Sequence, residues 1–237
     1  MSLRHPLFKC DMIVYYYRNA DQLSPERLEE LIACLPQQQQ EIVARMKSHR
    51  HRCEQTIAYI MLCHAIKSRR IRIADTFHLI RNFETEHLTQ RYLKRNPPLW
   101  AFGEHGKPYI TNYEGIYFNI SHCNEAVAVA VSNREVGIDV EGRRKFSDAL
   151  LQRAFSDEEQ KVVHNSGDPQ KDFACIWTRK EAWFKYTGTG ILMDHLKTTE
   201  TDAKATGCVI STVPIFNADQ GHYDFWLSYV EKKQITF

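Results

Sequence analysis

The sequence has few residues that interrupt regular structure, and it lacks any long hydrophobic segment. Its 237 residues include ten glycines and eight prolines, too few for a collagen-like or low-complexity chain. The longest uninterrupted apolar run is Ile57–Cys63, far short of the about 20 residues that a membrane helix needs. The first residues, Met1–Pro6, contain no apolar stretch typical of a secretion signal. These absences predict a globular, cytoplasmic protein that makes no membrane contact.

Paired cysteines are also missing. The seven cysteines are an odd number, and no two of them form a C-x-x-C pair. This pattern favours reduced thiols in a cytosolic protein over a disulfide framework or a structural zinc site. Apolar residues make up 43% of the chain, so a chain of this length can bury a sizeable core without either kind of cross-link.

The charge is nearly balanced overall but uneven along the chain. The net charge is +2, yet eight lysines and arginines lie between Arg45 and Arg72 against one acid, Glu54. Such a stretch indicates either a solvated helix face or a site for phosphate or nucleic acid. A nucleic-acid-binding module would bind with a steep salt dependence and would be indifferent to Mg²⁺. Since no nucleic-acid-binding motif accompanies the stretch, we expect no nucleic-acid partner.

The first part of the chain predicts a strand followed by helices. Met12–Tyr17 is rich in aromatic and β-branched residues, which is typical of a strand. Ser24 before Pro25 predicts a helix start, with the serine as N-cap. Apolar residues at helical spacing in Glu54–Lys67 predict a buried helix.

The second part returns to strands before it becomes helical again. Ile116–Ile120, Ala126–Val131 and Glu135–Glu141 are predicted strands, and the short connector Ser132–Arg134 predicts that the last two form a hairpin. Helices are predicted after Ser156 and Pro169, and β structure from Thr201 onward, centred on Phe225–Val230. The fold class is therefore mixed α/β (α+β). We divide it into two comparable halves, residues 1–132 and 133–237.

Two carboxylates on the third strand are the first chemical signal. Because side chains alternate along a strand, Gly137, Asp139 and Glu141 share one face. Residues two apart on a strand are roughly 6–7 Å apart at the backbone, so both carboxylates can reach one hard cation such as Mg²⁺. The alternative is a solvent-facing edge strand that carries two ordinary acids.

A stripe on the helix after Pro169 supports the first alternative. Trp177, Glu181 and Lys185 are spaced at i, i+4 and i+8 and so lie on one face. The same spacing suits a plain surface ion pair between Glu181 and Lys185. However, Phe173, Trp177, Trp183 and Phe184 also lie on this helix, which indicates that much of it is buried.

These segments carry a resemblance to a known family. Val136–Glu141 (VGIDVE) and Trp177–Lys185 (WTRKEAWFK) resemble the paired motifs of the 4′-phosphopantetheinyl transferases. Gly106–Pro108 (GKP) and Phe118–His122 (FNISH) resemble two further segments of that family, in the same order. In length the chain is similar to the long, surfactin-synthetase-activating (Sfp-like) type. That type implies a pseudo-dimer of two similar α/β halves, with the active site in the cleft between them, and a monomer in solution.

The resemblance implies a Mg²⁺-dependent transfer reaction. The phosphopantetheine arm of coenzyme A would pass to a serine of an apo acyl or peptidyl carrier protein, releasing 3′,5′-ADP. Asp139, Glu141 and Glu181 would hold Mg²⁺, with Mn²⁺ as an alternative ion. Glu181, or a metal-bound water beside it, would take the serine proton, and Lys185 would neutralise phosphate charge. The carrier protein, from a fatty-acid, polyketide, peptide-synthetase or lysine pathway, stays open.

The resemblance also implies the residues that contact coenzyme A. Ser121 and His122 would touch its phosphates, with His122 counted among the catalytic residues, and Lys107 with Pro108 would contact the nucleotide. Arg52 would meet the 3′-phosphate as a fork-shaped donor. Asp139 and Lys185 complete this set. Where related enzymes carry lysines, this chain has Gln37–Gln40, so the corresponding 3′-phosphate contacts are either missing or supplied by Arg45, Lys47 or Arg50.

Overall fold

The computed structural model describes residues 12–70, 78–83, 93 and 96–233. Within these ranges two main sheets form, with strand orders β2-β1-β6-β5 and β7-β9-β8. The first sheet contains β1 (Met12–Arg18), β2 (His78–Asn82), β5 (Tyr117–His122) and β6 (Ala126–Ser132). The second contains β7 (Gly137–Gly142), β8 (Cys208–Asn217) and β9 (His222–Lys232). A short ribbon joins β3 (Trp100–Phe102) to β4 (Pro108–Ile110).

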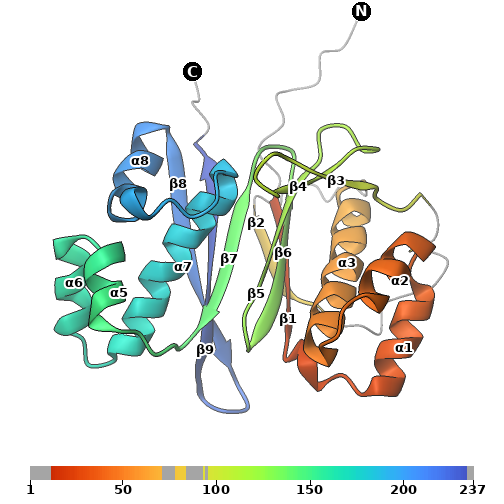
Figure 1. The fold of residues 1–237 in the computed structure, drawn as a ribbon, viewed down its shortest axis with the longest axis horizontal. Helices are drawn as coiled ribbons and strands as arrows, with labels where there is room; N and C mark the ends of the chain where they lie inside the picture. Colours follow the sequence, from red (N-terminus) through yellow and green to blue (C-terminus); the bar gives the residue numbers. More distant parts are fainter. Residues whose placement is uncertain (1–11, 71–77, 84–92, 94–95, 234–237) are drawn as a thin grey trace, which may run out of the picture.

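Helices cover the outer face of each main sheet, so that the two sheets meet in the middle of the molecule (Figure 1). Beside the first sheet lie α1 (Pro25–Cys34), α2 (Gln37–Ala44) and α3 (His49–Arg70), after a short turn, η1 (Ala20–Gln22). Beside the second lie α5 (Asp148–Ala154), α6 (Asp157–His164), α7 (Pro169–Thr187), η3 (Met193–Thr198) and α8 (Thr199–Ala205). The predicted α/β class is confirmed.

The alternation of alanine and valine in β6 explains this layering. Every residue of β6 is buried. Val127, Val129 and Val131 pack in the core that includes α3. Ala126, Ala128 and Ala130 pack instead against the second sheet. The small alanine face lets the two sheets approach closely, while the valine face fills the space beneath the helix.

One predicted connection is wrong. We expected Ala126–Val131 and Glu135–Glu141 to form a hairpin, but β6 pairs with β1 and β5, whereas β7 pairs with β9. Both hydrogen-bonding edges of β6 are therefore already used. The chain after Ser132 crosses to the second sheet, and β7 packs over β6 face to face through Val136, Ile138 and Val140.

The predicted helix signals hold in the structure. Ser24 caps α1, and Ser156 with Glu159 forms a complete capping box on α6. Helix α7 starts with Asp168 as N-cap and ends at Gly188, whose φ of 71° is left-handed, which suits glycine. The β structure expected from Thr201 onward begins later, because α8 precedes β8 and β9. None of the helices in the described ranges meets the length and hydropathy expected of a membrane span.

Candidate active site

Gly137 allows α7 to lie directly against β7. A Cβ atom at residue 137 would lie 2.1 Å from the carbonyl oxygen of Ala182 and 2.5 Å from the backbone nitrogen of Tyr186. Real Cβ atoms essentially never come that close, so only glycine fits here. Because Asp139 shares the Gly137 face of the strand, its side chain faces α7. Asp139 is 2% exposed, so the alternative of a solvent-facing acid is wrong for this residue.

Lys185 of α7 meets Asp139 of β7. Its Nζ lies 2.6 Å from Asp139 Oδ1 and 2.8 Å from Ser121 Oγ. The Ser121 hydroxyl donates to the same Asp139 oxygen at 2.7 Å. Burial lowers the pKa of Lys185, but Asp139 and Glu181 outweigh burial and raise it overall. Lys185 is therefore a charged lysine that contacts β5 of the first sheet and β7 of the second.

Glu181 completes the stripe on α7. Its Oε1 accepts a hydrogen bond from Trp177 Nε1 at 2.7 Å, and its Oε2 lies 3.9 Å from Lys185 Nζ. Burial raises the pKa of Glu181, and the negative charge of Asp139 raises it further. Trp177 thus fixes one carboxylate oxygen and leaves the other on the side of Lys185.

Glu141 is the third carboxylate. Its Oε1 accepts from Arg144 Nη1 at 2.9 Å. Burial, followed by the charge of Asp139, raises the pKa of Glu141 to about 7 despite Arg144. Asp139 and Glu181 therefore both raise the pKa of this third acid, as expected for like charges held close together.

Three carboxylates are the ligand type that a hard divalent cation prefers, but here their oxygens do not surround a common point. Among the residues that the structure describes, no cluster of three or more His, Cys, Asp or Glu side chains forms a ready metal site. Instead Asp139 pairs with Lys185, and Glu141 pairs with Arg144. One observation nevertheless fits a cation: Asp139 Oδ2 is buried and has no hydrogen-bond partner in the described part of the chain. Such an atom is costly to bury unless a ligand satisfies it.

Two polar residues of β5 hold β7 in place. Asn119 Oδ1 accepts from the backbone N–H of Ile138 at 3.0 Å, and Ser121 Oγ accepts from that of Val140 at 3.3 Å. Both side chains are buried. They join the first sheet to the strand that carries Asp139. Sequence reasoning missed this role of Asn119, although the period-two spacing of Asn119 and Ser121 places both on one face of the strand.

Ser121 and His122 point in opposite directions, because successive side chains alternate along a strand. Ser121 is buried, and its hydroxyl contacts Asp139, Lys185 and the backbone of β7. The His122 side chain is 55% exposed, and its Nδ1 lies 3.5 Å from Glu54 Oε2. Burial lowers the pKa of His122, and Lys185 lowers it further, while Glu54 opposes both. Only His122 of this pair is open to an external ligand.

The other predicted nucleotide contacts lie on several elements. Lys107, before β4, donates to the Tyr186 carbonyl at 2.8 Å and pairs with Glu135 at 2.6 Å, which ties it to the end of α7. Pro108 is the first residue of β4 and is half-buried. Arg52 of α3 pairs with Glu29 of α1 at 2.7 Å. Lys47 is exposed on the connection between α2 and α3.

The polar stretch Gln37–Gln40 forms the start of α2 rather than a charged surface. Gln37 donates to Glu41 and Gln40 to the Leu35 carbonyl, while Gln39 is buried. In the basic stretch, Arg50 and Arg52 pair with acids. Arg72, and the side chains of Arg69 and Arg70, lie outside the described residues.

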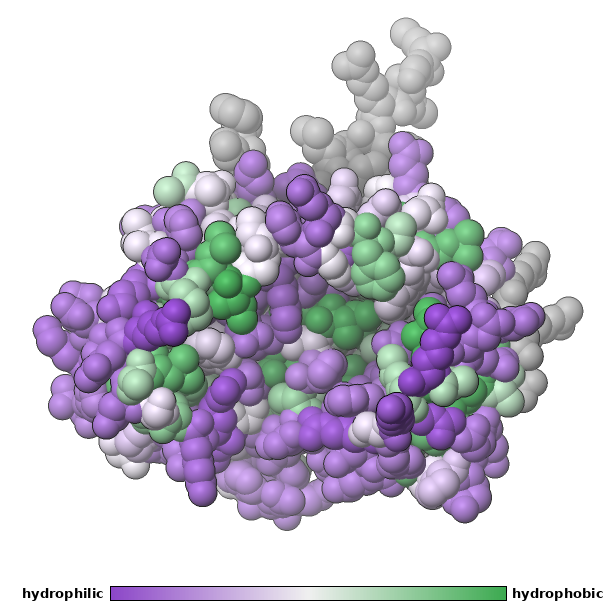
Figure 2. Space-filling model, viewed as in Figure 1, coloured by the Kyte–Doolittle hydropathy of each residue, from purple (hydrophilic) through white to green (hydrophobic). Residues whose placement is uncertain are grey.

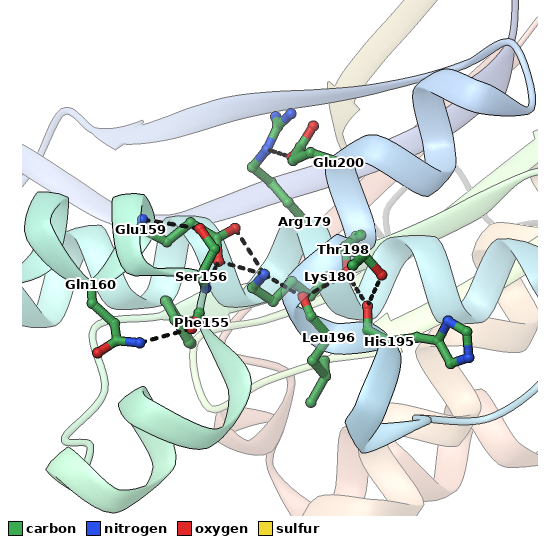
Figure 3. A network of polar contacts seen from close by, with 11 residues as sticks. Phe155, Ser156, Glu159, Gln160, Arg179, Lys180, His195, Leu196, Thr198 and Glu200 are labelled. Carbon is green, nitrogen blue, oxygen red and sulfur yellow. Dashed lines mark hydrogen bonds and ion pairs between the residues drawn. The ribbon is translucent and has the colours of Figure 1, made fainter.

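Lys180 is a buried charge that sequence reasoning left without a role. It is 1% exposed, and its Nζ contacts Glu159 at 2.7 Å and donates to the Leu196 carbonyl at 2.6 Å. Figure 3 shows that this lysine of α7 meets the start of α6 and the turn η3 at one point. These contacts fix α7 to α6 and η3, and so help to hold the neighbouring Glu181 in position.

Residues 135–235 match a family model described as the 4′-phosphopantetheinyl transferase superfamily. The matched segment contains Asp139, Glu141, Glu181 and Lys185. The resemblance inferred from the motifs is confirmed. The matched segment does not contain Arg52, Lys107 or His122, so their assignments rest on motif and geometry alone.

Curated relatives agree with this assignment over 36–43% of the chain. The 4′-phosphopantetheinyl transferase psf-1 of Bacillus pumilus is 38% identical over 88 residues, covering 36% of this chain and 38% of psf-1. Sfp of Bacillus subtilis is 32% identical over 104 residues, covering 43% of this chain and 46% of Sfp. HetI of Nostoc sp. is 38% identical over 94 residues, covering 36% of this chain and 40% of HetI. The chain thus spans less than half the length of each of these relatives.

Proposed function

We propose that this chain is a 4′-phosphopantetheinyl transferase. It transfers the phosphopantetheine arm of coenzyme A to a serine of an apo acyl or peptidyl carrier protein and releases 3′,5′-ADP. In this proposal residues 1–132 and 133–237 act as two similar halves of one monomer, and the reaction occurs between them. The two helix-covered sheets that meet through β6 and β7 support this arrangement (Figure 1).

One observation carries the proposal: Lys185 contacts two carboxylates at the junction of the two sheets, and the charges of these two acids reach a third. Lys185 contacts Asp139 at 2.6 Å and Glu181 at 3.9 Å, and Glu141 has its pKa raised to about 7 beside them. A purely structural ion pair needs one acid for one base. Here three acids lie beside two bases, Lys185 and Arg144, and Asp139 Oδ2 has no hydrogen-bond partner among the described residues; both facts support a further cation at this site.

The residues would divide the chemistry among them. Asp139, Glu141 and Glu181 would hold Mg²⁺, which when bound neutralises charge on the pyrophosphate and polarises it. Lys185, with its raised pKa, stays protonated and would neutralise charge on the departing nucleotide. Glu181, or a water beside it, would accept the proton of the carrier serine.

The nucleotide would lie along the end of β5 and the start of α3. His122 is exposed there, and Arg52 and Lys47 lie near the start of α3. The face of the molecule seen in Figure 2 carries many hydrophilic residues, with apolar patches between them.

Mass spectrometry tests the proposal directly. The chain is incubated with coenzyme A, Mg²⁺ and a panel of apo carrier proteins from fatty-acid, polyketide, peptide-synthetase and lysine pathways. We expect at least one carrier to gain the mass of one phosphopantetheine group, and 3′,5′-ADP to appear in equal amount. No mass gain on any carrier, with Mg²⁺ or Mn²⁺, would contradict the proposal.

A further inference from the structure

Glu54 is a buried acid in the second turn of α3 for which the proposed reaction has no role. Its side chain is only 6% exposed. Burying a carboxylate costs several kcal/mol unless partners compensate for the lost water. One oxygen, Oε1, accepts from Arg50 Nε at 2.6 Å, and the other, Oε2, lies 3.5 Å from His122 Nδ1. The acid therefore joins α3 to the last residue of β5.

Arg50 strengthens this junction. Its guanidinium also donates to Asn124 Oδ1, in the turn between β5 and β6. The residues on either side of His122 are thus held in place: Ser121 contacts β7 and α7, and Asn124 contacts α3. With Nδ1 facing Glu54, the other ring nitrogen, Nε2, remains for a ligand.

We propose that Glu54 is a positioning residue for phosphate recognition: it holds the His122 ring by Nδ1, so that Nε2 donates to a phosphate of the nucleotide. The inference rests on the proposed function, because it takes the nucleotide as the ligand. Both ring nitrogens must carry a proton in that arrangement, one for Glu54 and one for the phosphate. His122 therefore takes up a proton when the nucleotide binds.

The charges around His122 explain why Glu54 is needed. Arg50 and His51 of α3 and Lys185 of α7 all lower the pKa of His122, as burial does, and Glu54 raises it. Without Glu54, three positive or titratable groups would oppose the imidazolium form. A bound phosphate adds negative charge on the other side of the ring, so the phosphate and Glu54 together favour the doubly protonated ring.

Calorimetry on the full chain measures both nucleotide binding and the proton uptake that accompanies it. The protein is titrated with 3′,5′-ADP at pH 7 in buffers of different ionisation enthalpy, which gives affinity and the number of protons taken up. We expect uptake approaching one proton for the unaltered chain. Glu54→Gln keeps the side-chain shape but removes its charge. We expect this variant to lose most of the proton uptake and to bind 3′,5′-ADP about tenfold more weakly. Glu30→Gln, an exposed acid paired with Arg27 on α1, is the matched control and should change neither.

A merely structural role for Glu54 gives a different result. Glu54→Gln would then lower the melting temperature while affinity and proton uptake stay at the values of the unaltered chain, and the proposal would be overturned. NMR of the unaltered chain provides a test that needs no variant. We expect ¹⁵N signals of His122 that show Nδ1 protonated without ligand and both nitrogens protonated with 3′,5′-ADP. His122 signals that 3′,5′-ADP leaves unshifted would also overturn the proposal.

The outcomes separate this inference from the proposed function. If the unaltered chain modifies a carrier protein but the Glu54 variants bind nucleotide normally, only the role of Glu54 fails. If the unaltered chain binds neither coenzyme A nor 3′,5′-ADP, the proposed function fails and this inference fails with it.

Discussion

Lys185 and Asp139 form an ion pair of 2.6 Å between α7 and β7. Asp139 is almost fully buried, while Lys185 retains 31% of its side-chain exposure. The lysine offsets part of the negative charge that Asp139, Glu141 and Glu181 place in one region. This explains how the chain can hold three acids in one region of the fold.

Replacing Glu181 separates a catalytic role from an ordinary helix ion pair. Glu181→Gln keeps the side-chain shape and removes its charge and basicity. We expect transfer to a carrier protein to fall by at least about a hundredfold. The melting temperature should stay the same or rise, because repulsion from Asp139 is relieved. Lys185→Ala should lower transfer similarly but also lower stability, because it leaves Asp139 buried without its cation.

The control for this experiment is Glu200→Gln. Glu200 pairs with Arg179 on the other side of α7 and is half exposed. A surface ion pair contributes less than about 1 kcal/mol, so both rate and stability should hardly change. Near-normal transfer by Glu181→Gln and Lys185→Ala would mean that the stripe on α7 is only structural.

Glu141 should make stability depend on pH. Its pKa is raised to about 7, above its ordinary value of 4.5. The folded state therefore binds a proton that the unfolded state has released between these values, so the free energy of unfolding falls as pH rises from about 4.5 to 7. Glu141→Gln should remove this slope and stabilise the chain at pH 8 by an amount on the order of 2 kcal/mol. Urea unfolding at pH 5 and pH 8 measures both changes.

Mg²⁺ should reverse the destabilisation that Glu141 causes. A ligand that binds only the folded state raises its stability by mass action, so millimolar Mg²⁺ should raise the melting temperature at pH 8. The gain should be smaller at pH 5, where Glu141 is protonated, and smaller in Glu141→Gln. A Mg²⁺ effect equal in the variant and the unaltered chain would argue against Glu141 as a ligand.

Arg52 tests the nucleotide end of the site. If it meets the 3′-phosphate, Arg52→Ala should raise the KM for coenzyme A roughly tenfold or more, and that for dephospho-coenzyme A much less. Arg52 is paired with Glu29 at 2.7 Å, so Glu29→Gln should release it and leave the KM for coenzyme A equal or lower. Equal losses for both substrates in Arg52→Ala would place Arg52 outside the phosphate contacts.

Gly137→Ala should disturb the site through the backbone alone. The added methyl group would overlap the Ala182 carbonyl at 2.1 Å, so α7 must move away from β7. We expect a loss of about 1–3 kcal/mol of stability together with a strong loss of transfer, since Glu181 and Lys185 move with the helix. Gly167→Ala, where an added methyl group meets open space, is the control. The urea midpoints of both variants measure the expected difference in stability.

Local signals in the sequence determined most of the individual elements. Period-two spacing placed Asp139 and Glu141 on one strand face, and period-four spacing placed Trp177, Glu181 and Lys185 on one helix face, as the structure confirms. The helix starts near Ser24, Ser156 and Pro169 were also predictable, because a helix cap acts within three residues of itself.

Only the tertiary structure decided how these elements meet. The short connector after β6 looked like a hairpin, yet β7 joins β9 from the far end of the chain, since β1 and β5 already occupy both edges of β6. The contacts of Asn119 with β7 and of Glu54 with His122 span 19 and 68 residues of sequence. Hydrogen bonds and ion pairs at such separations depend on how sheets and helices stack, which no local pattern of residues encodes.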